Sequence, residues 1–144
     1  MQEIHDYLVR EEESGLILSL GGSKQQLSLP GVLVEKGFKL ANGESLWLSS
    51  NDSPYEETLF VSLVNSKNLV VDKLELFKPY TPGILNEVVV GDSSIQFEFW
   101  AEETHQVAVG KDKKLRFPRL FSEAGCYYLS KFMPSRLSIS KLEK

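Results

Sequence analysis

The chain has 144 residues, of which 42% are hydrophobic and 25% are charged, and its formal net charge is -4. This length predicts a single β-rich domain over residues 1–144, whose core is large enough to be stable without disulfides. The acidic balance lacks the clustered lysines and arginines that bind phosphate backbones, so it excludes nucleic acid as an expected partner.

The sequence also lacks the patterns of membrane and secreted proteins. Its apolar runs are interrupted by Ser, Asn, Lys or Asp well before the ~18 apolar residues that a membrane helix needs. Residues 1–10 include Glu3, His5 and Asp6, where a signal peptide requires an unbroken apolar segment. The one cysteine, Cys126, permits no intrachain disulfide. We therefore expect a cytoplasmic protein with no membrane contact.

The N-terminal segment allows two interpretations. Ile4, Tyr7 and Leu8 have helical spacing, which favours a short helix between Met1 and Glu13. The alternative is an opening strand from Ile4 to Val9. In that alternative, the acidic residues 11–13 are expected to form a solvated connection.

From Leu16 onward the apolar residues recur with a period of two, which is typical of strands. Asn42-Gly43 follows one such run, and this dipeptide favours a tight hairpin turn. Residues 59–64 are apolar on both faces, which predicts a central strand or one that lies between two layers. In residues 69–77 the facing pattern changes at Asp72-Lys73, and a β-bulge at that point would explain the change.

The last third of the chain continues the strand pattern. Residues 95–100 alternate most regularly, and further short strands are predicted at 107–109, 115–117, 127–129 and 137–139. Residues 120–125 are compatible with a helical turn. The most basic stretch, between Lys111 and Arg119, is interrupted by Asp112 and is expected to be a solvated turn.

These patterns amount to about eleven short strands with frequent turn signals and few helical segments. The fold class expected is therefore mainly β: an antiparallel, jelly-roll-like β-sandwich, with a short N-terminal helix as an optional addition. A closed β-barrel is the alternative.

No residue pattern identifies a catalytic or metal centre. The two histidines, His5 and His105, are distant in sequence, and His105 is expected to be a lone surface residue. Cys126 is expected to begin a strand as a small buried thiol. The adjacent carboxylates Glu56 and Glu57 are expected to be solvated loop ends. We therefore expect no catalytic residues, no metal and no cofactor.

The remaining functional signal is aromatic. Trp47 lies on the opposite strand face from Leu46 and Leu48, and Trp100 shares its face with polar residues, so the two indoles could form a stacking platform for a sugar ring or a partner's side chain. Tyr55, Tyr80 and Tyr128 would extend this ligand-binding surface. The competing interpretation is that a second layer or a loop covers the rings, because tryptophan is highly buried on average.

Three functions follow from these patterns. The first is a non-catalytic recognition or assembly protein that acts through a protein surface, with a protein partner or self-association into a homo-oligomer. The second is a module that binds carbohydrate or another small ligand through exposed aromatic residues. The third is a small β-barrel enzyme built on His105, Cys126 or the carboxylates.

Overall fold

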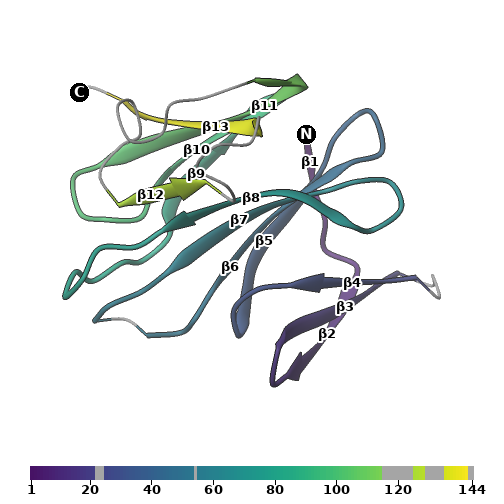
Figure 1. Ribbon diagram of the computed structural model, residues 1–144, viewed down its shortest axis with the longest axis horizontal. Helices are drawn as coiled ribbons and strands as arrows, with labels where there is room; N and C mark the ends of the chain where they lie inside the picture. The colour runs from purple at the N-terminus through teal and green to yellow at the C-terminus, as the bar shows by residue number, and fades with distance from the viewer. Residues whose placement is uncertain (22–24, 54, 115–124, 129–134, 143–144) are drawn as a thin grey trace.

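The computed structural model describes residues 1–21, 25–53, 55–114, 125–128 and 135–142, and thirteen β-strands lie within these ranges (Figure 1). The largest sheet is antiparallel and has six strands in the order β1-β5-β6-β7-β8-β12. These strands are β1 (Gln2–Glu3), β5 (Leu33–Lys39), β6 (Ser45–Ser50), β7 (Leu59–Val64), β8 (Val70–Leu76) and β12 (Cys126–Tyr128).

Two smaller antiparallel sheets complete the fold. The four-stranded sheet has the order β13-β11-β10-β9, and its strands are β13 (Ser135–Leu142), β11 (Thr104–Lys114), β10 (Ser94–Glu98) and β9 (Asn86–Val90). The three-stranded sheet comprises β2 (Tyr7–Glu12), β3 (Gly15–Leu20) and β4 (Gln26–Leu29) in that order. Each sheet order begins and ends with a different strand, so the sheets are open, and the predicted β-sandwich is confirmed over its barrel alternative.

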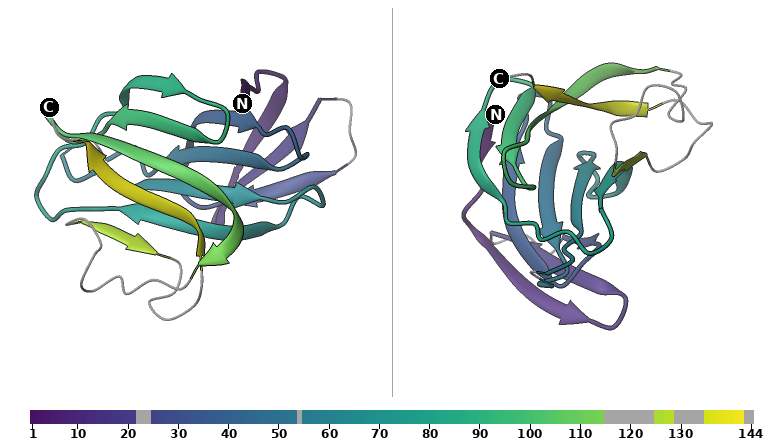
Figure 2. Two further views of the ribbon diagram at one scale, coloured as in Figure 1. Left: turned by 90° about the horizontal axis from the view of Figure 1, so that it is seen from above. Right: turned by 90° about the vertical axis from the view of Figure 1, so that its left-hand side faces the viewer.

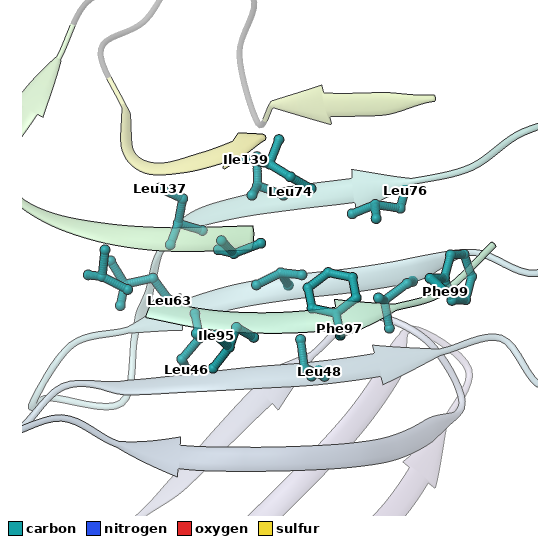
Figure 3. Packing of buried hydrophobic residues seen from close by; sticks show 14 of the residues in the cluster. Leu46, Leu48, Leu63, Leu74, Leu76, Ile95, Phe97, Phe99, Leu137 and Ile139 are labelled. Carbon is teal, nitrogen blue, oxygen red and sulfur yellow. The ribbon is translucent and has the colours of Figure 1, made fainter. Parts of the chain in front are cut away.

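The six-stranded sheet is the middle layer of three. Figure 2 shows the green and yellow strands of the four-stranded sheet on one side of it and the purple hairpin of the three-stranded sheet on the other. The main core lies between the six- and four-stranded sheets, where Leu46 and Leu48 face Ile95 and Phe97 (Figure 3). Full burial of each such side chain stabilises the fold by about 1.5–3 kcal/mol.

A second core lies on the other face of the six-stranded sheet. Leu16 and Leu18 of β3 pack there with Leu27 of β4 against Trp47 of β6. All six residues of β6 are buried, because the strand alternates between the two cores. β7 is covered on both faces along most of its length, as its two-sided apolar pattern predicted.

The predicted N-terminal helix is wrong. Tyr7–Glu12 is the strand β2, which pairs with β3 from Tyr7 opposite Leu20 to Glu12 opposite Gly15. Ile4, Tyr7 and Leu20 all pack against the second core. Helical spacing of two or three apolar residues was therefore a weaker determinant than this tertiary contact.

The hairpin at Asn42-Gly43 is confirmed. It joins β5 to β6, and Gly43 has a φ of 88°, a left-handed conformation that glycine adopts without strain. The irregularity predicted at Asp72-Lys73 lies slightly earlier, because Leu63 pairs with Asp72 and Val64 pairs with Val70. Val71 is thus the extra residue, and Asp72 faces the four-stranded sheet, where backbone donors of β13 bind it.

For the first part of the basic stretch, the prediction of a solvated turn is wrong. Lys111–Lys114 belongs to β11 instead of a turn, and it extends the longest described strand. Arg116 and Arg119, the strand expected at 115–117 and most of the helical turn expected at 120–125 lie outside the described residues. Among the described residues there is no helix long and apolar enough to cross a membrane.

Candidate functional site

Trp47 is fully buried, with 0% of its surface exposed. Its ring lies in the second core, and the Tyr7 ring meets it edge-on with the centroids 5.4 Å apart. Its Nε1 donates a hydrogen bond to Ser45 Oγ at 2.8 Å. Gly37 faces the ring from β5, and a Cβ at that position would lie 2.3 Å from a ring carbon. Trp47 therefore joins two layers and presents no open face to a ligand.

Trp100 follows β10 and is also buried, with 3% of its surface exposed. It lies at the end of the main core, with its ring centroid 5.5 Å from those of Phe99 and His105. Lys78 Nζ lies 4.2 Å from the ring centroid, a cation–π contact.

The two indoles thus belong to different cores on opposite faces of the six-stranded sheet. They do not form the shared open platform that strand alternation suggested. The physical reason is that a polar-looking strand face can be covered by another layer, and the three-stranded sheet provides that layer for Trp47.

The three predicted tyrosines differ in position. Tyr128 is half-buried on β12, and its hydroxyl accepts a hydrogen bond from the Ile139 backbone at 3.4 Å. Tyr55 and Tyr80 are strongly exposed, at 84% and 92%. Tyr55 is in the β6–β7 loop, and Tyr80 is in the β8–β9 connection.

A hydrogen bond between a side chain and the backbone joins the two loops that carry Tyr55 and Tyr80. Glu56 accepts a hydrogen bond from the Tyr80 backbone N–H at 2.6 Å. Tyr80 has a φ of 54°, a left-handed conformation that costs a bulky residue about 1 kcal/mol. The chain therefore holds an exposed aromatic side chain on strained backbone, an arrangement that is common at functional sites.

Glu57 organises the β6–β7 loop from within. Its carboxylate is buried and accepts hydrogen bonds from the backbone N–H groups of Asn51, Ser53 and Thr58 at 2.7, 2.7 and 3.0 Å. The expectation that Glu57 is a solvated loop end is wrong. Its neighbour Glu56 is exposed, and the sequence carried no signal to tell the two carboxylates apart.

A hollow of about 180 Å³ lies beside the Tyr80 connection, lined by residues that include Pro82, Ile84, Phe99 and Trp100. The connection is fixed to the end of β10 because the Ile84 N–H donates to the Phe99 carbonyl at 2.9 Å. Ile84 itself is exposed. We call the two loops that carry the exposed side chains of Tyr55, Tyr80 and Ile84 the tyrosine end.

A charged cluster supports the Lys78–Trp100 contact. Lys78 and Lys141 lie 3.3 and 3.4 Å from the carboxylate of Glu103. Burial of this carboxyl raises its pKa, but the hydrogen bonds and positive charges of the two lysines outweigh burial, so the pKa of Glu103 lies below its usual 4.5. Glu103 therefore stays ionised and holds Lys78 over the indole.

His105 and Cys126 are packing residues. His105 is buried and stacks against Phe97 with the centroids 6.2 Å apart, so the prediction of a surface histidine is wrong. The Cys126 thiol is buried at the start of β12, as expected. Within the described ranges, no three His, Cys, Asp or Glu side chains are grouped to hold a metal ion.

The chain matches no protein-family model, no curated protein and no solved structure. Its function is therefore inferred from the chemistry of its own surface.

Proposed function

We propose that this protein is a non-catalytic recognition or assembly protein that binds another protein through the tyrosine end. The observation that carries the proposal is the exposure of Tyr80. Its surface is 92% exposed, its backbone is left-handed, and its N–H donates a hydrogen bond to Glu56. Tyrosine supplies a large contact area with few rotatable bonds, and it is enriched among the residues that dominate binding energy.

The loops at the tyrosine end fit this role. Glu57 orders one loop through three backbone hydrogen bonds, and the Ile84–Phe99 bond fixes the other. Loops that a rigid scaffold holds in place lose little entropy on binding. With its one cysteine, Cys126, the chain can form no intrachain disulfide, which is compatible with a cytoplasmic location, and we propose this location with the function.

Self-association is a second form of the same proposal. β9 is an edge strand of the four-stranded sheet, and Val89 and Val90 on it are exposed. Unpaired edges with apolar side chains favour strand pairing between chains. Sedimentation across a range of protein concentrations tests this form: a monomer at every concentration would restrict the proposal to a different protein partner.

The test of the tyrosine end compares three immobilised proteins as baits for cell extract, with captured proteins quantified by mass spectrometry. They are the wild type, the double variant Tyr55→Ser/Tyr80→Ser and the control Leu8→Ser, which removes another strongly exposed side chain, from β2. We expect partners to be retained by the wild type and the control and lost by the double variant. Equal capture by all three baits would overturn the assignment to this surface.

A further inference from the structure

A second hollow, of about 340 Å³, lies where the three-stranded sheet meets the turns of the six-stranded sheet. Figure 1 shows the three-stranded sheet below the turns that join β5 to β6 and β7 to β8. The residues that line the hollow include Ile4, Asp6 and Leu20. From the six-stranded sheet and its turns it is lined by Lys39, Ser45 and Asn68. We call it the inter-sheet cleft. Its volume is within the range of small-molecule sites.

The hydroxyl of Ser45 is an oriented donor in this cleft. Ser45 is 8% exposed, and its Oγ accepts the hydrogen bond from Trp47 Nε1. An indole N–H is only a donor, so the hydroxyl proton of Ser45 must go to a different acceptor. No acceptor among the described residues takes it. A water or a ligand atom in the cleft can supply that acceptor.

Two opposite charges line the same cleft without neutralising each other. Lys39 and Asp6 form no ion pair with each other or with any other described residue. The Asp6 carboxylate lies over Gly21, where a Cβ would be 2.0 Å from Oδ2. Glycine at this position therefore leaves the space that the carboxylate occupies.

Asn68 adds an acceptor to the cleft. Its Nδ2 donates to Gln25 Oε1 at 3.1 Å, which orients the amide and leaves Oδ1 as an acceptor. The two apolar wall residues, Ile4 and Leu20, also pack against the second core. The cleft thus combines a cation, an anion, a directed hydroxyl and an apolar wall.

We propose that the inter-sheet cleft binds a small zwitterionic ligand of the α-amino-acid type. The ligand ammonium pairs with Asp6, its carboxylate binds Lys39 and the Ser45 hydroxyl, and its side chain lies against Ile4 and Leu20. A saccharide fits less well, because it would leave both charges unpaired and no aromatic ring of the described residues lines the cleft for stacking. This site is separate from the tyrosine end and does not depend on it.

Trp47 provides the readout, because its Nε1–H binds the hydroxyl that the ligand engages. In an NMR titration with millimolar L-leucine, we expect a saturable shift of the Trp47 indole N–H and of the Ser45 and Gly21 amides. The Trp100 indole N–H belongs to the other core and is expected to stay in place, so it serves as an internal reference.

Analogues of the probe test the two charges on the unaltered protein. N-acetyl-leucine lacks the ammonium and leucinamide lacks the carboxylate, so each is expected to bind about tenfold more weakly than leucine. Equal shifts with leucine and both analogues would overturn the proposal, as would no saturable shift with leucine. Saturation by glucose without saturation by leucine would also overturn it, in favour of a saccharide site.

Variants test the residues themselves. Lys39→Gln and Asp6→Asn change exposed side chains, and each is expected to weaken leucine binding about tenfold. The matched controls are Lys36→Gln, on the same strand but paired with Glu3, and Asp52→Asn, in the β6–β7 loop. If the controls weaken binding as much as the cleft variants, the ligand is not in this cleft.

Discussion

The guanidinium of Arg136 on β13 binds both carboxylate oxygens of Glu44, which lies in the turn between β5 and β6. Arg136 Nη2 donates to Glu44 Oε1 at 2.7 Å, and Nη1 donates to Oε2. The same arginine reaches the Gly110 carbonyl through Nε at 2.9 Å, and Asn42 binds Glu44 from the other side. Two sheets that enclose the main core are therefore joined at their margin by a largely buried ion pair.

This pair predicts a pH-dependent stability. The hydrogen bonds from Arg136, and secondarily from Asn42, lower the pKa of Glu44 below its usual 4.5 despite its burial. The folded-state pKa is lower than the unfolded one, so the stabilisation is complete above about pH 4.5 and is lost as pH falls through the lowered value. Glu44→Gln is expected to lower the free energy of unfolding by about 1–3 kcal/mol at pH 7.

Urea denaturation at pH 7 and pH 3 measures the effect. The difference between wild type and Glu44→Gln should narrow at pH 3, because the Glu44 carboxyl of the unfolded chain is protonated there and part of the stabilisation from the ionised carboxylate is lost. The exposed pair Arg10–Glu12 supplies the control, since Glu12→Gln is expected to change stability by less than about 1 kcal/mol at either pH. A difference that is the same at both pH values would contradict the assignment.

Asp72 makes a second connection between the sheets. Its Oδ2 accepts the backbone N–H groups of Arg136 and Leu137 at 2.8 and 2.9 Å, and its Oδ1 accepts that of Lys73 at 2.9 Å. Asp72→Asn places an amide N–H₂ against backbone donors and is expected to destabilise the protein by about 2–3 kcal/mol. Equilibrium urea denaturation measures the loss, and Asp92→Asn in the exposed β9–β10 turn is the control. A loss no larger than that of the control would contradict the bonding.

The contact between Gly37 and Trp47 predicts a steric coupling. A methyl group at position 37 would overlap the indole, so Gly37→Ala is expected to destabilise by about 1–3 kcal/mol. In a Trp47→Leu background the same substitution should cost much less, because the ring is gone. Thermal denaturation of the four proteins gives the coupling energy. Additive effects would show that the ring does not press on Gly37.

The left-handed backbone of Tyr80 predicts how glycine at this position changes the stability of the protein. Tyr80→Gly removes the strain of the left-handed residue and is expected to leave the protein equally stable or more stable by up to about 1 kcal/mol. Leu8 is also exposed and lies in the extended strand β2, so Leu8→Gly is expected to destabilise slightly, by about 0.5–1 kcal/mol. Chemical denaturation compares the two. Equal destabilisation by both would mean that the Tyr80 backbone is not strained.

The sandwich itself was predictable from local pattern. Period-two alternation over residues 16–20, 46–48 and 95–99 identifies strands because successive side chains point to opposite faces. Asn42-Gly43 identified a hairpin because glycine tolerates a left-handed turn. The N-terminal strand was predicted only as the alternative to a helix, because the spacing of Ile4, Tyr7 and Leu8 is also compatible with a helix, and pairing with β3 decides between the two.

The candidate sites were predictable only in part. Tyr55 and Tyr80 were identified by residue type. The hydrogen bond by which Glu56 joins their loops is visible only in the structure. The inter-sheet cleft could not be predicted from the sequence, because Asp6, Lys39 and Ser45 belong to no recognisable motif and line one cleft only when two sheets pack together. Glu57 and His105 were predicted to be exposed, and both are buried. The loop around Glu57 covers its carboxylate, whereas residues of the main core cover His105.

The sequence by itself determined that the chain forms strands, where several of them turn, and which side chains of a strand share a face. Only the tertiary structure decided what covers each face. Trp47 illustrates the difference: alternation placed it opposite Leu46 and Leu48, but packing of β2–β4 turned that face into a second core. Alternation is a property of one strand, whereas burial depends on which sheet is adjacent, and that contact joins residues far apart in the chain.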